Sequence, residues 1–205
     1  MAKTKHLQSD NCNKTKRVLV ISASPRVRSN SDALADEYIR GAKEAGHEVE
    51  KISIREKNIQ FCKGCLACSK RNRAEEFNRG EGGSICIIKN DDMGEIIQKM
   101  HDADVICWAT PIYYYEMSAQ MKVVIDRGNP LYTSDYHFRD IYMLTSAAED
   151  EEFVPQRAVA GLTGWIDCFE NAELKGTVFA GGVNDPGDIK EHPSLQKAYE
   201  MGKSI

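Results

Sequence analysis

Hydrophobic and polar positions alternate between two periods along this chain, one typical of buried strands and one of amphipathic helices. Apolar runs or alternation predict strands at residues 17–21, 48–54, 104–109, 141–145 and 174–180. Helical periodicity predicts helices at 31–45, 92–101, 117–126, 153–170 and 193–201. Five β–α alternations favour a parallel sheet covered by helices on both faces. Right-handed crossovers then predict a doubly wound sheet, whose ligands bind beyond the carboxyl ends of the strands.

The loop after the first predicted strand is rich in hydroxyl groups and leads directly into a helix. The first backbone N–H groups of such a helix have no partner within it and lie at the positive end of its dipole. Ser22, Ser24, Ser29, Asn30 and Ser31 add side-chain donors at the same point. The loop lacks the glycine patterns of triphosphate and dinucleotide sites. It therefore predicts a site for the single phosphate of a mononucleotide.

A second loop follows the strand at 104–109, where Pro111 is expected to end the strand. Three consecutive tyrosines come next, at positions 113–115, and they cannot all face one core. Planar aromatic side chains near a phosphate site suit the stacking of a planar heteroaromatic ring. The alternatives are a dimer interface or a loop packed on its own helix.

Composition narrows the partners that this chain is expected to have. It has 205 residues, 41% hydrophobic and 28% charged, with a net charge of −4. Nucleic acid and anionic membranes are therefore not expected as partners, and no apolar segment has the length to span a bilayer.

Residues 1–16 predict a polar N-terminal tail without a secretory signal. An odd number of cysteines, seven, without such a signal predicts a reducing compartment, the cytoplasm.

An irregular excursion at residues 59–90 contains most of the candidate metal ligands. Cys62, Cys65 and Cys68 have the compact spacing that holds an iron–sulfur cluster, and Cys86 is the candidate fourth thiolate of a [4Fe–4S] centre. A long stretch separates Cys68 from Cys86, which weakens this motif. Reduced structural thiols, a redox-active pair and a zinc site remain as alternatives.

Several of these motifs, taken in order, resemble one protein family. They are Ser-x-Ser-Pro-Arg with Ser-Asn-Ser in the first loop, Pro-Ile-Tyr-Tyr-Tyr with Ser-Ala-Gln-Met-Lys in the second, and the segments beginning at Cys62 and Cys86. Together they are similar to the NADPH-dependent FMN reductases and iron–sulfur flavoproteins of the flavodoxin-like superfamily. The resemblance covers the chain from about Lys16 to its end.

The resemblance implies a three-layer α/β/α flavodoxin-like fold at residues 17–205, with a five-stranded parallel sheet in the order 2-1-3-4-5 and non-covalently bound FMN. Three groups of residues match the family's cofactor loops. The phosphate loop is matched by Ser22, Ser24, Arg26, Ser29, Asn30 and Ser31. The loop along the flavin ring is matched by Pro111, Ile112, Tyr113 and Tyr114, and the third loop by Thr145, Ser146 and Ala147.

The implied function is an FMN-dependent NAD(P)H oxidoreductase that passes electrons to a small acceptor, such as a quinone, a flavin, a nitro compound or a metal centre. The flavin supplies the redox chemistry, so we expect no acid–base dyad, and the five scattered histidines form no metal-ligand motif. The resemblance also implies a homodimer or homotetramer. The alternatives are an electron-transfer flavoprotein carrying FMN plus a [4Fe–4S] cluster, without small-molecule turnover, and a thiol sensor that acts through the cysteine loop.

Overall fold

The computed structural model describes residues 14–71, 73–132 and 134–205, so most of the predicted tail at 1–16 lies outside it. Five parallel strands form the central sheet: β1 (Arg17–Ser22), β2 (Glu48–Ser53), β3 (Val105–Tyr113), β5 (Asp140–Ser146) and β6 (Glu173–Ala180). Their order is β2-β1-β3-β5-β6, which confirms the predicted doubly wound order. Strand order reverses at β1, so the loops after β1 and β3 diverge to opposite faces at the switch point.

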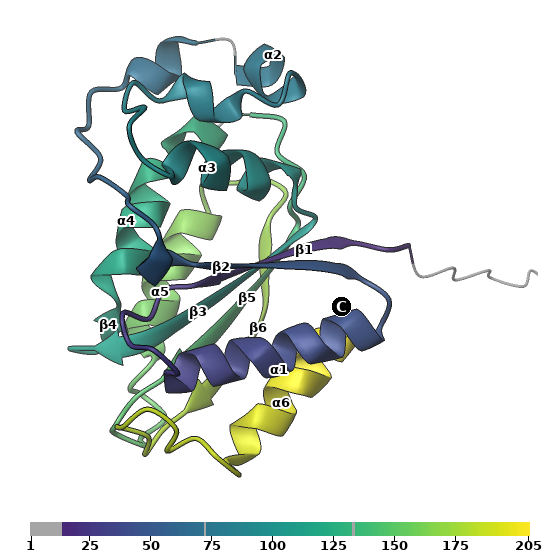
Figure 1. Ribbon diagram of the computed structural model, residues 1–205, viewed down its shortest axis with the longest axis vertical. Helices are drawn as coiled ribbons and strands as arrows, with labels where there is room; N and C mark the ends of the chain where they lie inside the picture. The colour runs from purple at the N-terminus through teal and green to yellow at the C-terminus, as the bar shows by residue number, and fades with distance from the viewer. Residues whose placement is uncertain (1–13, 72, 133) are drawn as a thin grey trace, which may run out of the picture.

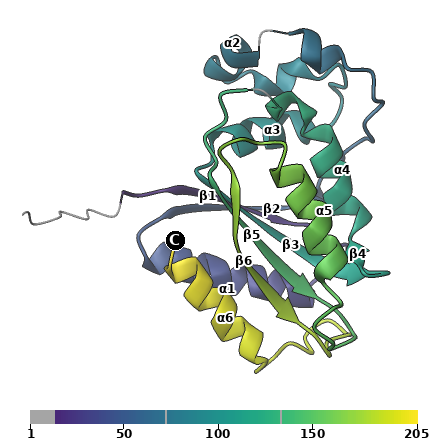
Figure 2. The same cartoon turned by 180° about the vertical axis from the view of Figure 1, so that it is seen from behind.

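Helices cover both faces of the sheet (Figures 1 and 2). One face holds α1 (Asn30–Glu44) and α6 (Pro193–Lys203), and the other holds α3 (Met93–Asp102), α4 (Ala119–Arg127) and α5 (Gln156–Ile166). Each face has its own core, because alternate strand residues point to opposite sides. Val18 and Val20 of β1 face α1, whereas Leu19 and Ile21 face α3.

Helices α1 and α6 cross at very short range through two glycines. A β-carbon on Gly41 would lie 2.1 Å from the carbonyl oxygen of Tyr199, and one on Gly202 would lie 2.0 Å from that of Tyr38. Only a residue without a side chain fits at either point. This crossing fixes the C-terminal helix against the helix that follows the first loop.

The predicted excursion is a cap of short helical turns at one end of the molecule, near α2 in Figure 1. Its elements are η2 (Ala67–Lys70), α2 (Arg73–Asn78) and η3 (Gly82–Ile85), whereas η1 (Ile54–Glu56) directly follows β2 and precedes the excursion. Phe77 and Ile85 are fully buried in the core on the α3 side. The cap is therefore anchored by apolar packing as well as by the polar contacts described below.

The ends of several elements differ from the sequence predictions. Pro111 does not end its strand, because β3 continues to Tyr113 and pairs with β5 through Pro111 and Ser146. A proline is tolerated here because β1 ends opposite Ala109, so no residue of β1 pairs with Pro111. The chain then turns back as a short antiparallel strand, β4 (Glu116–Met117), which the pattern did not predict.

The helix predicted at 153–170 is shorter, at Gln156–Ile166. Pro155 precedes its first residue, and after Ile166 the backbone tightens into bonds from Cys168 to Trp165 and from Phe169 to Ile166. Within the described part of the chain, no helix is long and apolar enough to cross a membrane.

Candidate functional site

Three loops at the carboxyl ends of β1, β3 and β5 enclose a cavity of about 270 Å³, here called the three-loop cavity. A fourth segment, after β6, closes its remaining side. The lining residues are Ser24, Arg26, Ser29, Asn30, Pro111, Ile112, Tyr113, Ser146, Ala147, Ala148, Val183, Asn184 and Pro186. Its position matches the ligand edge that the topology predicts.

The first loop brings the positive end of α1 to this cavity. Ser29 is the N-cap of α1, and its hydroxyl accepts a hydrogen bond from the backbone N–H of Asp32. The Ser24 hydroxyl accepts a hydrogen bond from the backbone N–H of Arg26, which tightens the turn. Both serines line the cavity, so hydroxyl donors and the α1 dipole point at the same space.

Nine of the thirteen predicted cofactor residues line the three-loop cavity, and four do not. Ser22 donates its hydroxyl to the Asp32 carboxylate, and the Ser31 hydroxyl contacts that of Ser29. Thr145 donates to the carbonyl of Val178 inside the sheet. Tyr114 is 97% exposed at the tip of the β3–β4 turn.

Sequence reasoning missed the fourth wall, residues 183–186. Asn30, placed in the phosphate loop from the motif, uses its side chain to hold this wall. Its amide donates to the Asp185 carbonyl and its side-chain oxygen accepts from the N–H groups of Gly187 and Ile189. Arg26 donates to the carbonyl of Asn184. The turn-forming run after β6, Asn184-Asp-Pro-Gly187, was the available signal.

The tyrosine loop places its three rings in different surroundings. Tyr113 lines the cavity and is 38% exposed, while Tyr114 points into solvent. Tyr114 and Tyr115 form the hairpin turn with left-handed backbones, at φ of 52° and 64°. Tyr115 stacks on Phe153 and donates a hydrogen bond from its hydroxyl to Glu149. This hydrogen bond raises the pKa of Tyr115. The hairpin is thereby tied to the third loop.

In the third loop the backbone of Ala147 is already engaged. Its N–H donates to the carbonyl of Ala180, and its carbonyl accepts from the N–H of Val183. The polar groups that the third loop brings to the cavity wall are therefore those of Ser146 and Ala148.

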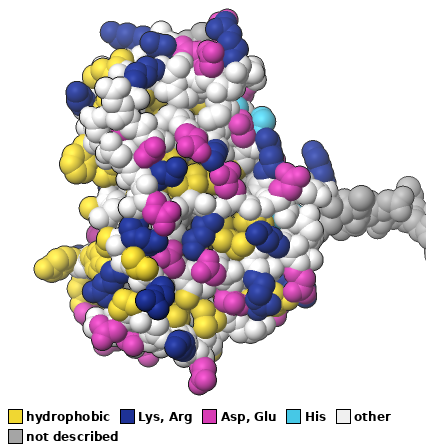
Figure 3. Space-filling view, in the orientation of Figure 1, with side chains coloured by type: hydrophobic (Ala, Val, Ile, Leu, Met, Phe, Trp, Pro, Cys, Tyr) yellow, Lys and Arg dark blue, Asp and Glu magenta, His cyan; other side chains and the backbone are white. Residues whose placement is uncertain are grey.

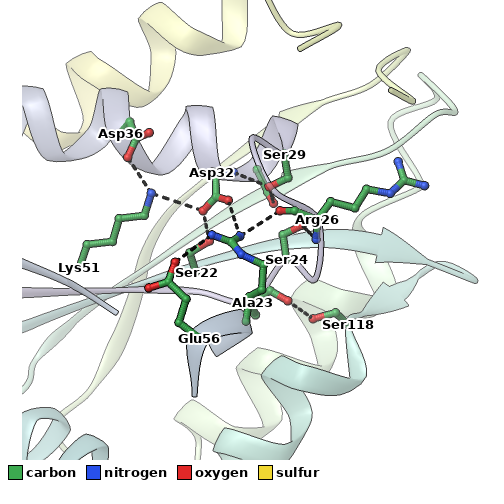
Figure 4. Close-up of polar contacts among 12 residues, drawn as sticks. Ser22, Ala23, Ser24, Arg26, Ser29, Asp32, Asp36, Lys51, Glu56 and Ser118 are labelled. Atoms are coloured by element: carbon green, nitrogen blue, oxygen red, sulfur yellow. Dashed lines mark hydrogen bonds and ion pairs between the residues drawn. The ribbon is translucent and has the colours of Figure 1, made fainter. Parts of the chain in front are cut away.

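A charged network lies directly behind the first loop (Figure 4). Asp32 is 8% exposed. Its carboxylate accepts a hydrogen bond from the Ser22 hydroxyl and lies 3.3 Å from both the Lys51 ammonium and the Arg55 guanidinium. Burial raises the pKa of Asp32, but the bonds from Ser22 and Lys51 outweigh it and hold that pKa below its ordinary value of 3.8. A permanent negative charge therefore lies within the first turn of α1, beside the predicted phosphate site.

The four candidate metal-ligand cysteines line one cavity of about 340 Å³, here called the cysteine cavity. Cys62, Cys65, Cys68 and Cys86 share it with residues from the end of α4. Asn129 donates its side-chain amide to the Cys68 sulfur at 2.9 Å. In the described part of the chain, no three ligating side chains are grouped as a metal site, and none of the six described cysteines forms a disulfide. The donor set suits a thiolate-bound group, but the sulfurs are not gathered around one point.

Arg127, the last residue of α4, anchors this cavity. Its side chain is 1% exposed and forms a two-pronged ion pair with Asp91, whose side chain is fully buried. The same guanidinium donates to the carbonyl of Gln60 at 2.7 Å. The pair joins α4 to both ends of the excursion.

No catalytic dyad was predicted, and the buried histidines have structural contacts. His101 is held between Asp102 and Asp135 and stacks on Phe77. His47 contacts the backbone of Lys16 and of Ile205.

Comparisons with known proteins agree on one family. The family model described as NADPH-dependent FMN reductase matches residues 16–180. An iron–sulfur flavoprotein of Methanocaldococcus jannaschii is 37% identical over 203 residues, covering 92% of this chain and 95% of that protein. One from Methanosarcina thermophila is 35% identical over 186 residues, covering 90% and 87%. An NAD(P)H:quinone oxidoreductase from Methanothermobacter marburgensis has the same fold, with a TM-score of 0.64 at 20% identity, covering 93% and 96%.

Proposed function

We propose that this chain, which belongs to the NADPH-dependent FMN reductase family, binds FMN in the three-loop cavity. Family membership makes the protein an FMN-dependent NAD(P)H oxidoreductase that acts on a small acceptor. FMN held there would supply the chemistry of hydride acceptance from a nicotinamide and of electron transfer to the acceptor. The observation that supports the placement is the cavity itself, which joins a helix N-terminus to an apolar wall.

The residues of the cavity fall into two groups, one that would bind the phosphate and one that would contact the flavin ring. Ser24 and Ser29, with the N-terminus of α1, would hold the phosphate. Pro111, Ile112 and Tyr113 would lie along the ring and exclude water from one side of it. Tyr113 is half-exposed, which leaves room for a nicotinamide or an acceptor to approach from solvent.

Two experiments test this function and this placement. Anaerobic stopped-flow measurement should show that NADH or NADPH bleaches the flavin absorbance, and absence of reduction by both would refute the oxidoreductase. A Ser24→Ala/Ser29→Ala variant should bind FMN at least about tenfold more weakly, because it loses two hydroxyl donors to a charged phosphate. Ser204→Ala, at the end of α6, is the matched control and should bind as wild type.

We further propose a homodimer or homotetramer in the cytoplasm. Tyr114 presents nearly its whole side chain to solvent beside the cavity, which a subunit contact would cover. Light scattering of the purified protein measures the subunit number, and a monomer would contradict this proposal.

On the face shown in Figure 3, basic and acidic side chains are interspersed, which gives no broad basic surface for nucleic acid.

The cysteine cavity favours a second candidate, an electron-transfer flavoprotein that also carries a [4Fe–4S] cluster. Four thiols from two segments line one cavity, and relatives of similar length bear the name iron–sulfur flavoprotein. Anaerobically purified protein would then contain about four iron and four acid-labile sulfide per chain. Cys62→Ser should remove both, while Cys168→Ser, at an exposed cysteine outside that cavity, should retain them. If the protein contains no iron, reduced thiols or a zinc site remain as the alternatives for these cysteines.

A further inference from the structure

The phosphate loop is built over a buried carboxylate of the same sign as its ligand. Asp32 lies three residues after Ser29, the N-cap that lines the three-loop cavity. A phosphate bound at this helix end would experience repulsion from Asp32, and the partly buried surroundings screen it less than water does. The site can therefore bind an anion only if another group offsets that charge.

We propose that Arg55 is the residue that makes this loop able to hold a phosphate, by neutralising Asp32 and fixing the loop backbone at the same time. The proposal rests on the placement of FMN given above. Arg55 lies in η1, after β2, outside the three-loop cavity. It is thus a positioning residue, acting on the ligand through Asp32 and the loop.

One guanidinium nitrogen of Arg55 makes both contacts. Its Nη1 lies 3.3 Å from Asp32 Oδ2 and donates to the Arg26 carbonyl oxygen at 3.0 Å. The Arg26 carbonyl belongs to the turn between Ser24 and Ser29. Arg55 thereby joins the two ends of the anion site, the turn and the first residues of α1.

Lys51 cannot replace Arg55 in this role. Its ammonium lies 3.3 Å from Asp32 and 2.7 Å from Asp36. Arg55 likewise lies 3.3 Å from Asp32 and 3.1 Å from Glu56, so the two cations differ in their contact with the loop and not in how their charge is shared. No contact between Lys51 and the loop backbone is present in the described structure. Figure 4 shows Lys51 reaching Asp32 from the side of Asp36, away from Ser24 and Ser29.

The test compares FMN with riboflavin, which has the same ring and no phosphate. Flavin-free protein is titrated with each ligand, with quenching of flavin fluorescence as the signal. Arg55→Ala should weaken FMN binding by at least about tenfold, because Asp32 then keeps only Lys51 as a counter-ion and the loop loses its contact at the Arg26 carbonyl. Riboflavin binding should change less than about twofold, because riboflavin does not use the anion site.

A second substitution that removes the Asp32 charge separates an electrostatic effect from an effect on folding. Asp32→Asn in the Arg55→Ala background should restore most of the lost FMN affinity, because the repelling charge is removed together with its counter-ion. Arg55→Lys, which keeps the charge, should fall between wild type and Arg55→Ala. Lys175→Ala removes one positive charge from an exposed pair on β6 and should bind both flavins as wild type.

Three results would overturn the proposal: unchanged FMN affinity in Arg55→Ala, equal weakening of FMN and riboflavin, or no recovery in the double variant. Should Arg55→Ala fail to fold, the FMN-to-riboflavin ratio of Arg55→Lys decides in its place. Wild-type protein that binds neither flavin would instead refute the proposed function. The two failures are thus distinct.

Discussion

The ion pair between Asp91 and Arg127 should be one of the most costly contacts in this protein to break. The Asp91 carboxylate accepts from Arg127 Nη1 at 2.5 Å and Nη2 at 3.2 Å, and from the backbone N–H groups of Gln60 at 3.0 Å and Met93 at 3.2 Å. Both charged side chains are almost completely buried. Asp91→Asn keeps the size of the side chain but leaves the arginine charge without a counter-ion.

We expect Asp91→Asn to lower the free energy of unfolding by about 3–5 kcal/mol, the usual cost of leaving one partner of a buried pair uncompensated. Urea denaturation followed by circular dichroism measures this loss. Asp126→Asn is the matched control, because Asp126 makes an exposed i,i+4 pair with Lys122 on the same helix and should cost less than about 0.5 kcal/mol. A loss below about 1 kcal/mol for Asp91→Asn would refute the reasoning.

The pH dependence provides an independent check of the same pair. Burial raises the pKa of Asp91, but the Arg127 hydrogen bond and the Gln60 N–H outweigh it, so that pKa lies below its ordinary value of 3.8. A lowered carboxyl pKa stabilises the fold above the ordinary value and ceases to do so as pH falls through the lowered one. The difference in stability between wild type and Asp91→Asn should therefore shrink below about pH 3.8. In addition, thiol labelling of Cys68 should accelerate in the variant at neutral pH, because the excursion loses its anchor.

Three further predictions concern the sheet and the helices. Burial raises the pKa of Tyr142 to about 12 from an ordinary 10.0, so stability should fall between pH 10 and 12, and Tyr142→Phe should flatten that decline in urea titrations. Gly202→Ala should destabilise the fold by roughly 3 kcal/mol or more, because its β-carbon would overlap the Tyr38 carbonyl. Gly164→Ala meets open space within α5 and should stabilise the fold by about 0.5–1 kcal/mol. Thermal unfolding measures both changes. Ser118→Ala removes the N-cap of α4 and a bond to the Ala23 carbonyl, so it should cost about 1–2 kcal/mol and weaken FMN binding in a fluorescence titration.

The sequence predicted the layered architecture because strand and helix periods alternate clearly along it. The predicted order of the parallel strands is confirmed. Local pattern could not show that β3 continues past Pro111, since that depends on β1 ending opposite Ala109. Nor could it show β4, a two-residue strand whose turn uses tyrosines in place of the usual glycine or asparagine.

The candidate site was predictable where a loop motif carries its own donors, and less so where distant segments meet. Ser24 and Ser29 line the cavity that the motif suggested. Ser22 faces Asp32 instead, a contact across ten positions that no spacing rule indicates. The wall at 183–186 and the contacts of Arg55 depend on segments that follow different strands and meet only in the folded protein, and single-sequence reasoning does not place them.

The bonds that join the first loop to the wall after β6 have a consequence for biosynthesis. Arg26 and Asn30 reach partners 155 to 159 positions later in the chain. During synthesis the first strand and its loop leave the ribosome long before that wall exists. The nascent chain therefore cannot assemble the complete pocket until residues 183–189 have emerged, so the cofactor meets a complete site only after that point.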